Sequence, residues 1–142
     1  NAQYLRAAAN RLKRLVLQLN GPAIRKAKHD PELVAEKLRA YEGCVSDVLL
    51  DLSGGNGKMI DVEYARRFLD HLVPKLPYFV FGVAGGLCPE TIDKIAPLLN
   101  EFPSLNIDAE SRLRDEADHL VVERANEYLR AAAKMIARHA RR

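Results

Sequence analysis

The chain has 142 residues and a mass of 15.9 kDa, with 48% hydrophobic and 29% charged residues. These values indicate one compact domain over residues 1–142 and exclude a disordered chain. The net charge of +3 is a small basic excess. Much of it lies at Arg138, Arg141 and Arg142, which indicates a solvated helix end rather than a nucleic-acid surface. The apolar runs are far shorter than the roughly 20 residues that a membrane-spanning helix needs.

Apolar periodicity predicts an N-terminal helix over 2–13, followed by four strand–helix units. The predicted strands cover 15–19, 48–52, 79–84 and 105–109. Asn20-Gly21-Pro22 is expected to end the first strand. Helices are expected to begin at Asp30-Pro31, Asp61 and Pro89, and the last helix is expected over 118–138.

Continuous apolar strands that alternate with amphipathic helices predict an α/β fold with a parallel sheet and right-handed crossovers. Two architectures remain open. One is an open, doubly wound sheet of four strands, and the other is half of a (β/α)8 barrel. A complete barrel takes about 200 residues or more, so this chain is too short for one.

Polar residues follow the predicted strands at the end where parallel α/β folds place their sites. Asp51 follows Val48-Leu49-Leu50 directly, and Asp108 has the same position on the last strand. A carboxylate there suits a general acid or base. The alternatives are an aspartate that caps the following loop, for Asp51, and one that holds neighbouring loops, for Asp108.

Two glycine-rich segments are candidate phosphate-binding loops. Gly54-Gly55-Asn56-Gly57-Lys58 lacks the spacing of a Walker A motif, but its glycines would let an anion approach the backbone. Gly85-Gly86 precedes the helix expected at Pro89, where free N–H groups and the helix dipole would favour an anion. The alternatives are a flexible surface turn and a tight strand–helix turn.

Cys44 and Cys88 have no CxxC spacing, and no secretory signal precedes them, so we expect a cytoplasmic protein. Cys88 is expected at a helix N-cap, in a capping or packing role, with a reactive thiol as the alternative. Cys44 is expected to be structural. The four histidines show no metal-ligand spacing: His29, His71, His119 and His139.

From about Val48 to Arg114, the chain resembles the phosphoribosylanthranilate isomerase family, a (β/α)8-barrel enzyme of tryptophan biosynthesis. Leu49-Leu50-Asp51 resembles the strand that carries the family's catalytic aspartate. The segment from Gly54 to Asp61 is similar to the family's GG(T/S)GK-x-FD stretch. Ala84 to Glu90 resembles its GGL-x-PEN loop, and Ile107 to Ser111 resembles the start of DVSSGVE.

The resemblance implies the C-terminal half of a barrel, with strands five to eight, that isomerises an aldose to a ketose by an Amadori rearrangement. Asp51 would be the general acid that protonates the ring oxygen of a phosphoribosylamine. The residues expected to bind the phosphate or the rest of the substrate are Gly54, Gly55, Gly57, Lys58, Gly85, Gly86, Asp108, Ser111 and Arg112. Arg112 stands where the family has glycine, and could close the phosphate pocket or serve another anionic substrate. No metal or organic cofactor is implied.

The family's general base is a cysteine in an ICG motif, which this sequence does not contain. A divergent or non-catalytic phosphosugar-binding protein is therefore the alternative function. A half-barrel that needs a partner is the structural alternative. The expected partners are a phosphorylated small molecule and either a second copy of the chain or an N-terminal half.

Overall fold

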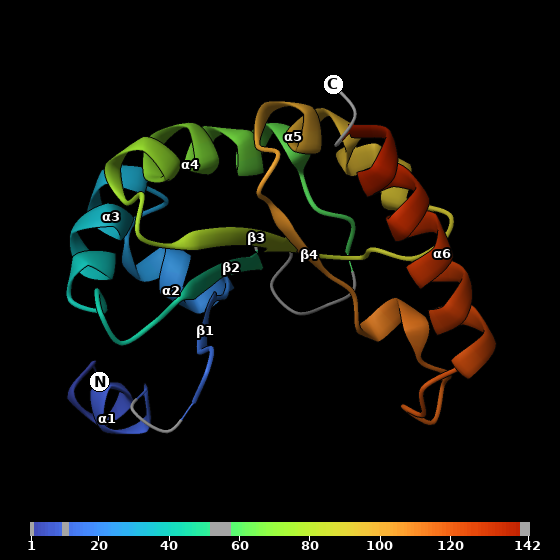
Figure 1. Ribbon diagram of the computed structural model, residues 1–142, viewed down its shortest axis with the longest axis horizontal. Coiled ribbons are helices and arrows are strands. Elements are labelled where there is room, and N and C mark those ends of the chain that lie inside the picture. The colour runs from blue at the N-terminus through green and yellow to red at the C-terminus, as the bar shows by residue number, and fades with distance from the viewer. Residues whose placement is uncertain (1, 10–11, 52–57, 140–142) are drawn as a thin grey trace.

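The computed structural model describes residues 2–9, 12–51 and 58–139 (Figure 1). It is an α/β fold with one four-stranded parallel sheet. In chain order the elements are α1 (Ala2–Ala9), β1 (Val16–Leu19), α2 (Gly21–Lys26), α3 (Pro31–Arg39), β2 (Asp47–Asp51), α4 (Val62–Lys75), β3 (Val80–Ala84), the 3-10 helix η1 (Ile92–Ile95), α5 (Ala96–Glu101), β4 (Asn106–Asp108), the 3-10 helix η2 (Ser111–Leu113) and α6 (Val122–His139).

The strands lie side by side in the order of the sequence, β1-β2-β3-β4. The four predicted strands are therefore confirmed, with bounds that differ by at most one residue within the described chain. A doubly wound sheet reverses its strand order at a switch point, and the described sheet has no such reversal. The consecutive order therefore argues against the first of the two architectures left open by the sequence.

One face of the sheet forms the core. Side chains alternate between the two faces of a strand, so Val48 and Leu50 share a face with Phe81 and Val83, their register neighbours. All four are buried beneath the helices. The described helices form an arc that runs from α3 over α4 and α5 to α6 (Figure 1).

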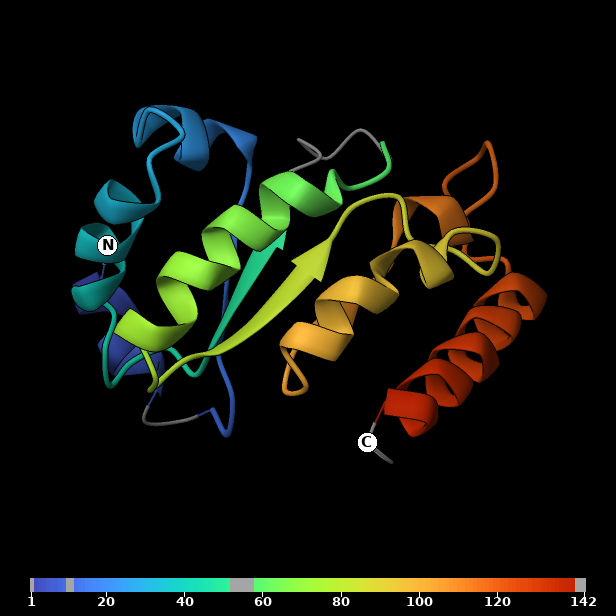
Figure 2. The ribbon, with the colours of Figure 1, turned by 90° about the horizontal axis from the view of Figure 1, so that it is seen from above.

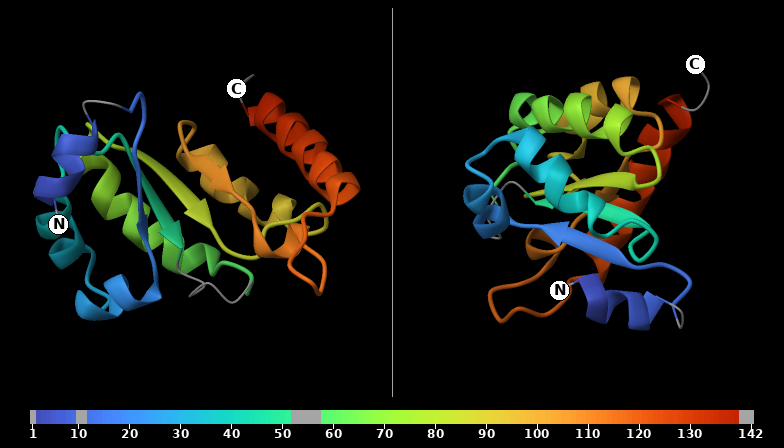
Figure 3. Two further views of the ribbon diagram at one scale, coloured as in Figure 1. Left: turned by 90° about the horizontal axis from the view of Figure 1, so that it is seen from below. Right: turned by 90° about the vertical axis from the view of Figure 1, so that its left-hand side faces the viewer.

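The other face of the sheet, called here the open face, carries a mixture of polar, small and apolar side chains. Gln18, Leu49, Gly82 and Asn106 lie in one register row across all four strands. A Cβ atom on Gly82 would lie 3.0 Å from the Cβ of Asn106, so any side chain at this position would force its neighbours to shift. Seen from this side, the strands lie in front of α4 (Figure 3, left).

At the amino end of the open face, Asp47 joins three strands. Its side chain is 3% exposed and accepts hydrogen bonds from Arg14 Nε at 2.7 Å, Ser46 Oγ at 2.6 Å and Asn106 Nδ2 at 3.0 Å. The guanidinium of Arg14 also forms an ion pair with it. These contacts, with that of Arg14 first, hold the pKa of Asp47 below its usual range despite its burial.

The N-caps predicted at Asp30 and Asp61 are confirmed, since each carboxylate accepts a backbone hydrogen bond from the first turn of its helix. The prediction that Asn20-Gly21-Pro22 ends the first strand is confirmed, since β1 ends at Leu19, but the helix that begins there was not predicted. These residues begin α2, in which Asn20 caps the helix and Pro22 lies in its first turn. The same three residues suit a turn and a helix start, and the buried side chain of Ile24 favours the helix.

The helix expected to begin at Pro89 is also placed differently. Residues 89–91 form a turn, η1 follows, and α5 begins only at Ala96. The thiol of Cys88 therefore does not lie at a helix N-cap, because Thr91 is the residue before η1. Within the described residues, no helix is both long and apolar enough to cross a bilayer.

Candidate functional site

Asp51 ends β2 at the carboxyl edge, the edge of the sheet at which all four strands end. The residue is 6% exposed although it lies on the open face. Its Oδ2 accepts a hydrogen bond of 3.0 Å from Nε2 of Gln18, which reaches across from β1. A buried carboxylate at the carboxyl edge of a parallel sheet is a group suited to general acid–base chemistry.

Asp108 ends β4 on the same face, one strand beyond Ala84. The register aligns Asp51, Ala84 and Asp108 in one row, so the two carboxylates flank the small side chain of Ala84. Loss of solvent around the carboxyl, and then the charges of Glu110 and Asp51, raise the pKa of Asp108. Two carboxylates of this kind on one edge are an arrangement suited to proton transfer.

The turn after β3 begins with Gly85 and Gly86 and is called here the glycine turn. Gly85 and Gly86 have φ angles of +134° and +60°, which glycine adopts without strain. A Cβ atom on Gly86 would lie 2.8 Å from the carbonyl carbon and oxygen of Lys58 and the nitrogen of Met59. The N–H of Ile60 donates to the carbonyl of Gly85 at 3.1 Å. The turn and the chain before α4 are therefore in direct contact.

Thr91 fixes the far side of this turn. Its hydroxyl donates to the carbonyl of Gly86 at 2.8 Å and accepts from the N–H of Cys88 at 3.0 Å. The N–H groups of Gly86 and Leu87, in contrast, have no acceptor among the described groups. Backbone N–H groups without a described acceptor are suited to holding an anion such as a phosphate oxygen.

An ionic cluster borders the glycine turn. Arg124 on α6 donates through Nη2 to Glu90 at 2.9 Å, while its buried Nε has no described partner. A hydrogen bond from Cys88, then one from its own backbone and the charges of Arg124 and Arg112, lower the pKa of Glu90. Burial, and then the charge of Asp108, raise the pKa of Tyr128 to about 12. The Tyr128 hydroxyl is also buried without a described partner.

The structure brings several of the predicted site residues to the carboxyl edge. Asp51, Gly85, Gly86 and Asp108 end or follow strands, and Lys58 lies exposed beside Gly86. Ser111 and Arg112 form the exposed start of η2, which begins three residues after Asp108. Gly54, Gly55 and Gly57 lie outside the described residues. Cys88 is buried, which agrees with a packing role, and Cys44 is buried beyond the amino end of the sheet.

Four residues at this edge were not predicted: Gln18 as a contact of Asp51, and Thr91, Arg124 and Tyr128. Thr91 could have been found from its spacing to Gly86 and Cys88, since threonine hydroxyls often close short turns. Arg124 and Tyr128 lie four residues apart on one side of α6, but helical spacing alone does not show which polar residues of a helix are buried. Across the described chain, no three His, Cys, Asp or Glu side chains are grouped so that they could hold a metal ion.

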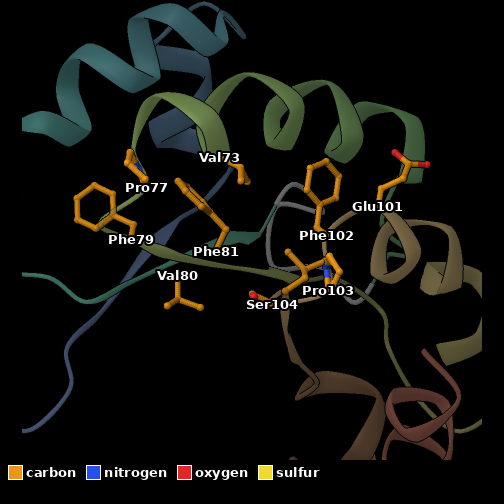
Figure 4. Close-up of a pocket in the computed structure, with 10 residues that line it drawn as sticks. Val73, Pro77, Phe79, Val80, Phe81, Glu101, Phe102, Pro103 and Ser104 are labelled. Atoms are coloured by element: carbon orange, nitrogen blue, oxygen red, sulfur yellow. The ribbon is translucent and has the colours of Figure 1, made fainter. Parts of the chain in front are cut away.

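A separate pocket of about 370 Å³ lies at the opposite, amino end of the sheet (Figure 4). Its lining is mostly apolar and comes from the end of α4, from β3 and from the segment between α5 and β4, including Phe81 and Phe102. The one carboxylate there, Glu101, is paired with Arg66 at 2.9 Å. This pocket therefore offers packing surface but no free acid or base.

No protein-family model and no curated protein matches this sequence. The case for a function therefore depends on the groups gathered at the carboxyl edge and on the motifs that surround them. Of these groups, the buried carboxylate of Asp51 and the open N–H groups of the glycine turn carry the most chemical information.

Proposed function

We propose that the chain is half of a (β/α)8 barrel, equivalent to strands five to eight, and that its carboxyl edge binds a phosphorylated small molecule. The support for the fold is the consecutive strand order, with helices over one face of the sheet. In a barrel the open face would be the interior, and Gln18, Leu49, Gly82 and Asn106 would line it.

The phosphate would bind at the glycine turn. The observation that carries this proposal is the pair of N–H groups on Gly86 and Leu87 that have no described acceptor. The carbonyls of Gly85 and Gly86 are already engaged by Ile60 and Thr91, so they are held in fixed positions. Lys58 would add a positive charge next to this turn. Such turns after the next-to-last strand of a barrel commonly bind phosphate.

The reaction would be the isomerisation of an aldose-type phosphoribosylamine to its ketose form in the cytoplasm, as in tryptophan biosynthesis. Asp51 would give its proton to the ring oxygen as the carbon–oxygen bond of the ring breaks. A base must then remove the proton from C2, and the sugar ends as an enol amine that becomes the ketose. General acid–base steps of this kind contribute about 10²–10⁴-fold each.

Phosphosugar binding without catalysis is the second candidate, and the thiols favour it. Cys88 is 0% exposed and Cys44 lies beyond the opposite end of the sheet. Neither is placed to remove a proton from a substrate held beside Asp51. A base would have to come from another part of a complete barrel.

The decisive experiment measures binding and turnover separately. Inorganic phosphate, titrated into the labelled chain, is expected to shift the amide NMR signals of Gly86 and Leu87. Lys58→Met should weaken this binding about fivefold, the effect of losing roughly 1 kcal/mol of charge contact. Lys94→Met, an equal loss of charge on the outer helix η1, should leave it unchanged. Signals of Gly86 and Leu87 that do not move would disprove the phosphate site.

Turnover is followed by the loss of phosphoribosylanthranilate fluorescence. An isomerase should lose at least about 100-fold in rate on Asp51→Asn, with phosphate binding retained. Phosphate binding without turnover, in the wild type as well as in Asp51→Asn, would favour the non-catalytic function. Turnover that is unchanged in Asp51→Asn would show that the role given to Asp51 is wrong.

A further inference from the structure

The fold has two flanks on which strands lack an outer neighbour. The β1 flank comprises residues 2–28, with α1, β1 and α2, and the β4 flank comprises residues 106–139, with β4, η2 and α6. Within the described sheet, β1 and β4 each pair with one strand only. Bare parallel edges are templates for pairing with further strands. Both flanks are therefore open for the same kind of contact.

Exposed apolar side chains gather on these two flanks. On α6, Val122, Leu129 and Ile136 are spaced by seven residues and form a stripe; they are 57%, 62% and 47% exposed. The adjacent side of α6, which packs against η1 and α5, carries the buried Tyr128, Ala132 and Met135. A helix with apolar side chains on two sides is suited to lie between two layers of protein. The exposed large apolar side chains of the β1 flank are Tyr4, Leu12 and Val16.

The charges of the two flanks are opposite at the carboxyl edge. Residues 1–29 contain seven Lys and Arg and no Asp or Glu, whereas residues 108–127 contain seven Asp and Glu and three Arg. At the end of the molecule where the strands finish, α2 lies on one flank and the acidic segment before α6 on the other (Figure 2). The exposed Arg25 and Lys26 of α2 therefore match the exposed Glu116 and Glu123.

We propose that the occupant of each flank is the opposite flank of a second copy of this chain. A twofold axis along the strand direction would set β1 of one copy beside β4 of the other, and α1 beside α6. All eight strands would stay parallel, and both edges of each copy would be paired at once. The exposed valines and leucines of the two flanks would then become core.

A second copy fits better than an unrelated partner, because each copy offers both of the surfaces that the other needs. The electrostatic attraction is confined to the carboxyl edge. At the other end α6 carries Lys134 and Arg138 and α1 carries Arg6, so that end must be held by apolar contact. The complex is expected to weaken as salt is raised, since exposed charges are screened.

Light scattering on the complete chain tests the proposal. A mass of about twice 15.9 kDa is expected at micromolar concentration. Leu129→Glu should give a folded monomer, with the dissociation constant raised at least about 100-fold, because it buries a charge at the contact. Lys37→Gln on the outer side of α3 changes the net charge equally and should leave the mass unchanged. Circular dichroism reports whether each variant is folded.

A charge exchange distinguishes this pairing from any other dimer. Arg25→Glu with Lys26→Glu should weaken association at least tenfold, and adding Glu116→Lys with Glu123→Lys to the same chain should restore it. A wild-type chain that stays monomeric overturns the proposal, as does a dimer that tolerates Leu129→Glu. The proposal is also overturned if the charge exchange does not restore association. A mass that keeps growing, as in a filament, overturns it as well. Phosphate binding, measured on the monomeric Leu129→Glu variant, tests the proposed function independently.

Discussion

Gly86 is the residue at which backbone geometry and the candidate site meet. Its φ of +60° and the 2.8 Å approach of Lys58 leave no room for a side chain. Gly86→Ala is expected to lower the free energy of unfolding by about 2–4 kcal/mol, from left-handed strain plus overpacking. Gly43→Ala is the matched control, because Gly43 has a φ of +75° but nothing within 4 Å of a Cβ. Gly43→Ala should lower the free energy of unfolding by only about 1–2 kcal/mol.

Urea denaturation of the two variants separates these contributions. Equal losses in both would mean that the contact between the glycine turn and Lys58 does not constrain the fold. A larger loss in Gly86→Ala, in contrast, would show that the turn and the segment before α4 are packed as one unit.

Asp108 gives a prediction about pH. Its pKa is raised by loss of solvent and by the charges of Glu110 and Asp51. Folding therefore favours the protonated form, and the contribution of this group to stability falls as the pH rises through its raised pKa. Carboxyl NMR titration should place the Asp108 pKa above the usual value of about 3.9. In Asp51→Asn it should move down, while Asp93→Asn on η1 should not change it.

Some residues of the candidate site could be predicted from the sequence, and others could not. Asp51 and Asp108 were predictable because polar residues that directly follow apolar strands must lie at the carboxyl edge. Tyr128 and Arg124 were not, since a long amphipathic helix does not indicate which of its polar groups will be buried. The pairing of Gln18 with Asp51 depends on the neighbour order of β1 and β2, which the sequence alone left open.

Among the elements, the strand beginnings depend on Asp47. This carboxylate links the start of β2 to Arg14 before β1 and to Asn106 on β4. Asp47→Asn keeps the shape of the side chain and removes its charge. At pH 7 it is expected to lower the free energy of unfolding by about 1–3 kcal/mol, as for lost hydrogen bonds to a buried charged group.

The pH dependence of this effect has a definite sign. The pKa of Asp47 is lowered on folding, so its contribution is present above the usual carboxyl pKa and is lost as the pH falls through the lowered one. Urea denaturation of both chains at neutral and at acid pH measures it. The difference between wild type and Asp47→Asn should shrink in acid, and a constant difference would show that the charge is not the cause.

The elements themselves were largely predictable. All four strands and the N-caps at Asp30 and Asp61 follow from short-range patterns, and the structure confirms them. The errors occurred where one motif fits two structures. Asn20-Gly21-Pro22 ends β1 as predicted but also begins α2, which was not predicted, and Pro89 begins a turn that delays α5 to Ala96. Tertiary packing, through Ile24 and Ile92, decides these cases.

For the molecule as a whole, the sheet has protected central strands and accessible outer ones. Hydrogen exchange should be slowest at the amides of β2 and β3, which have a strand on each side, and faster in β1 and β4. The comparison is made on the Leu129→Glu variant, so that self-association does not cover the edges. Equal protection across all four strands would contradict this arrangement.

The two buried thiols lie at opposite ends of the sheet, Cys44 before β2 and Cys88 after β3. Because neither is accessible, an alkylating reagent can modify each one only when the surrounding structure opens. The alkylation rate of each thiol thus measures how often the structure around it opens. Their relative labelling rates, read by mass spectrometry of peptides, would report which end of the molecule opens more often, without any added probe.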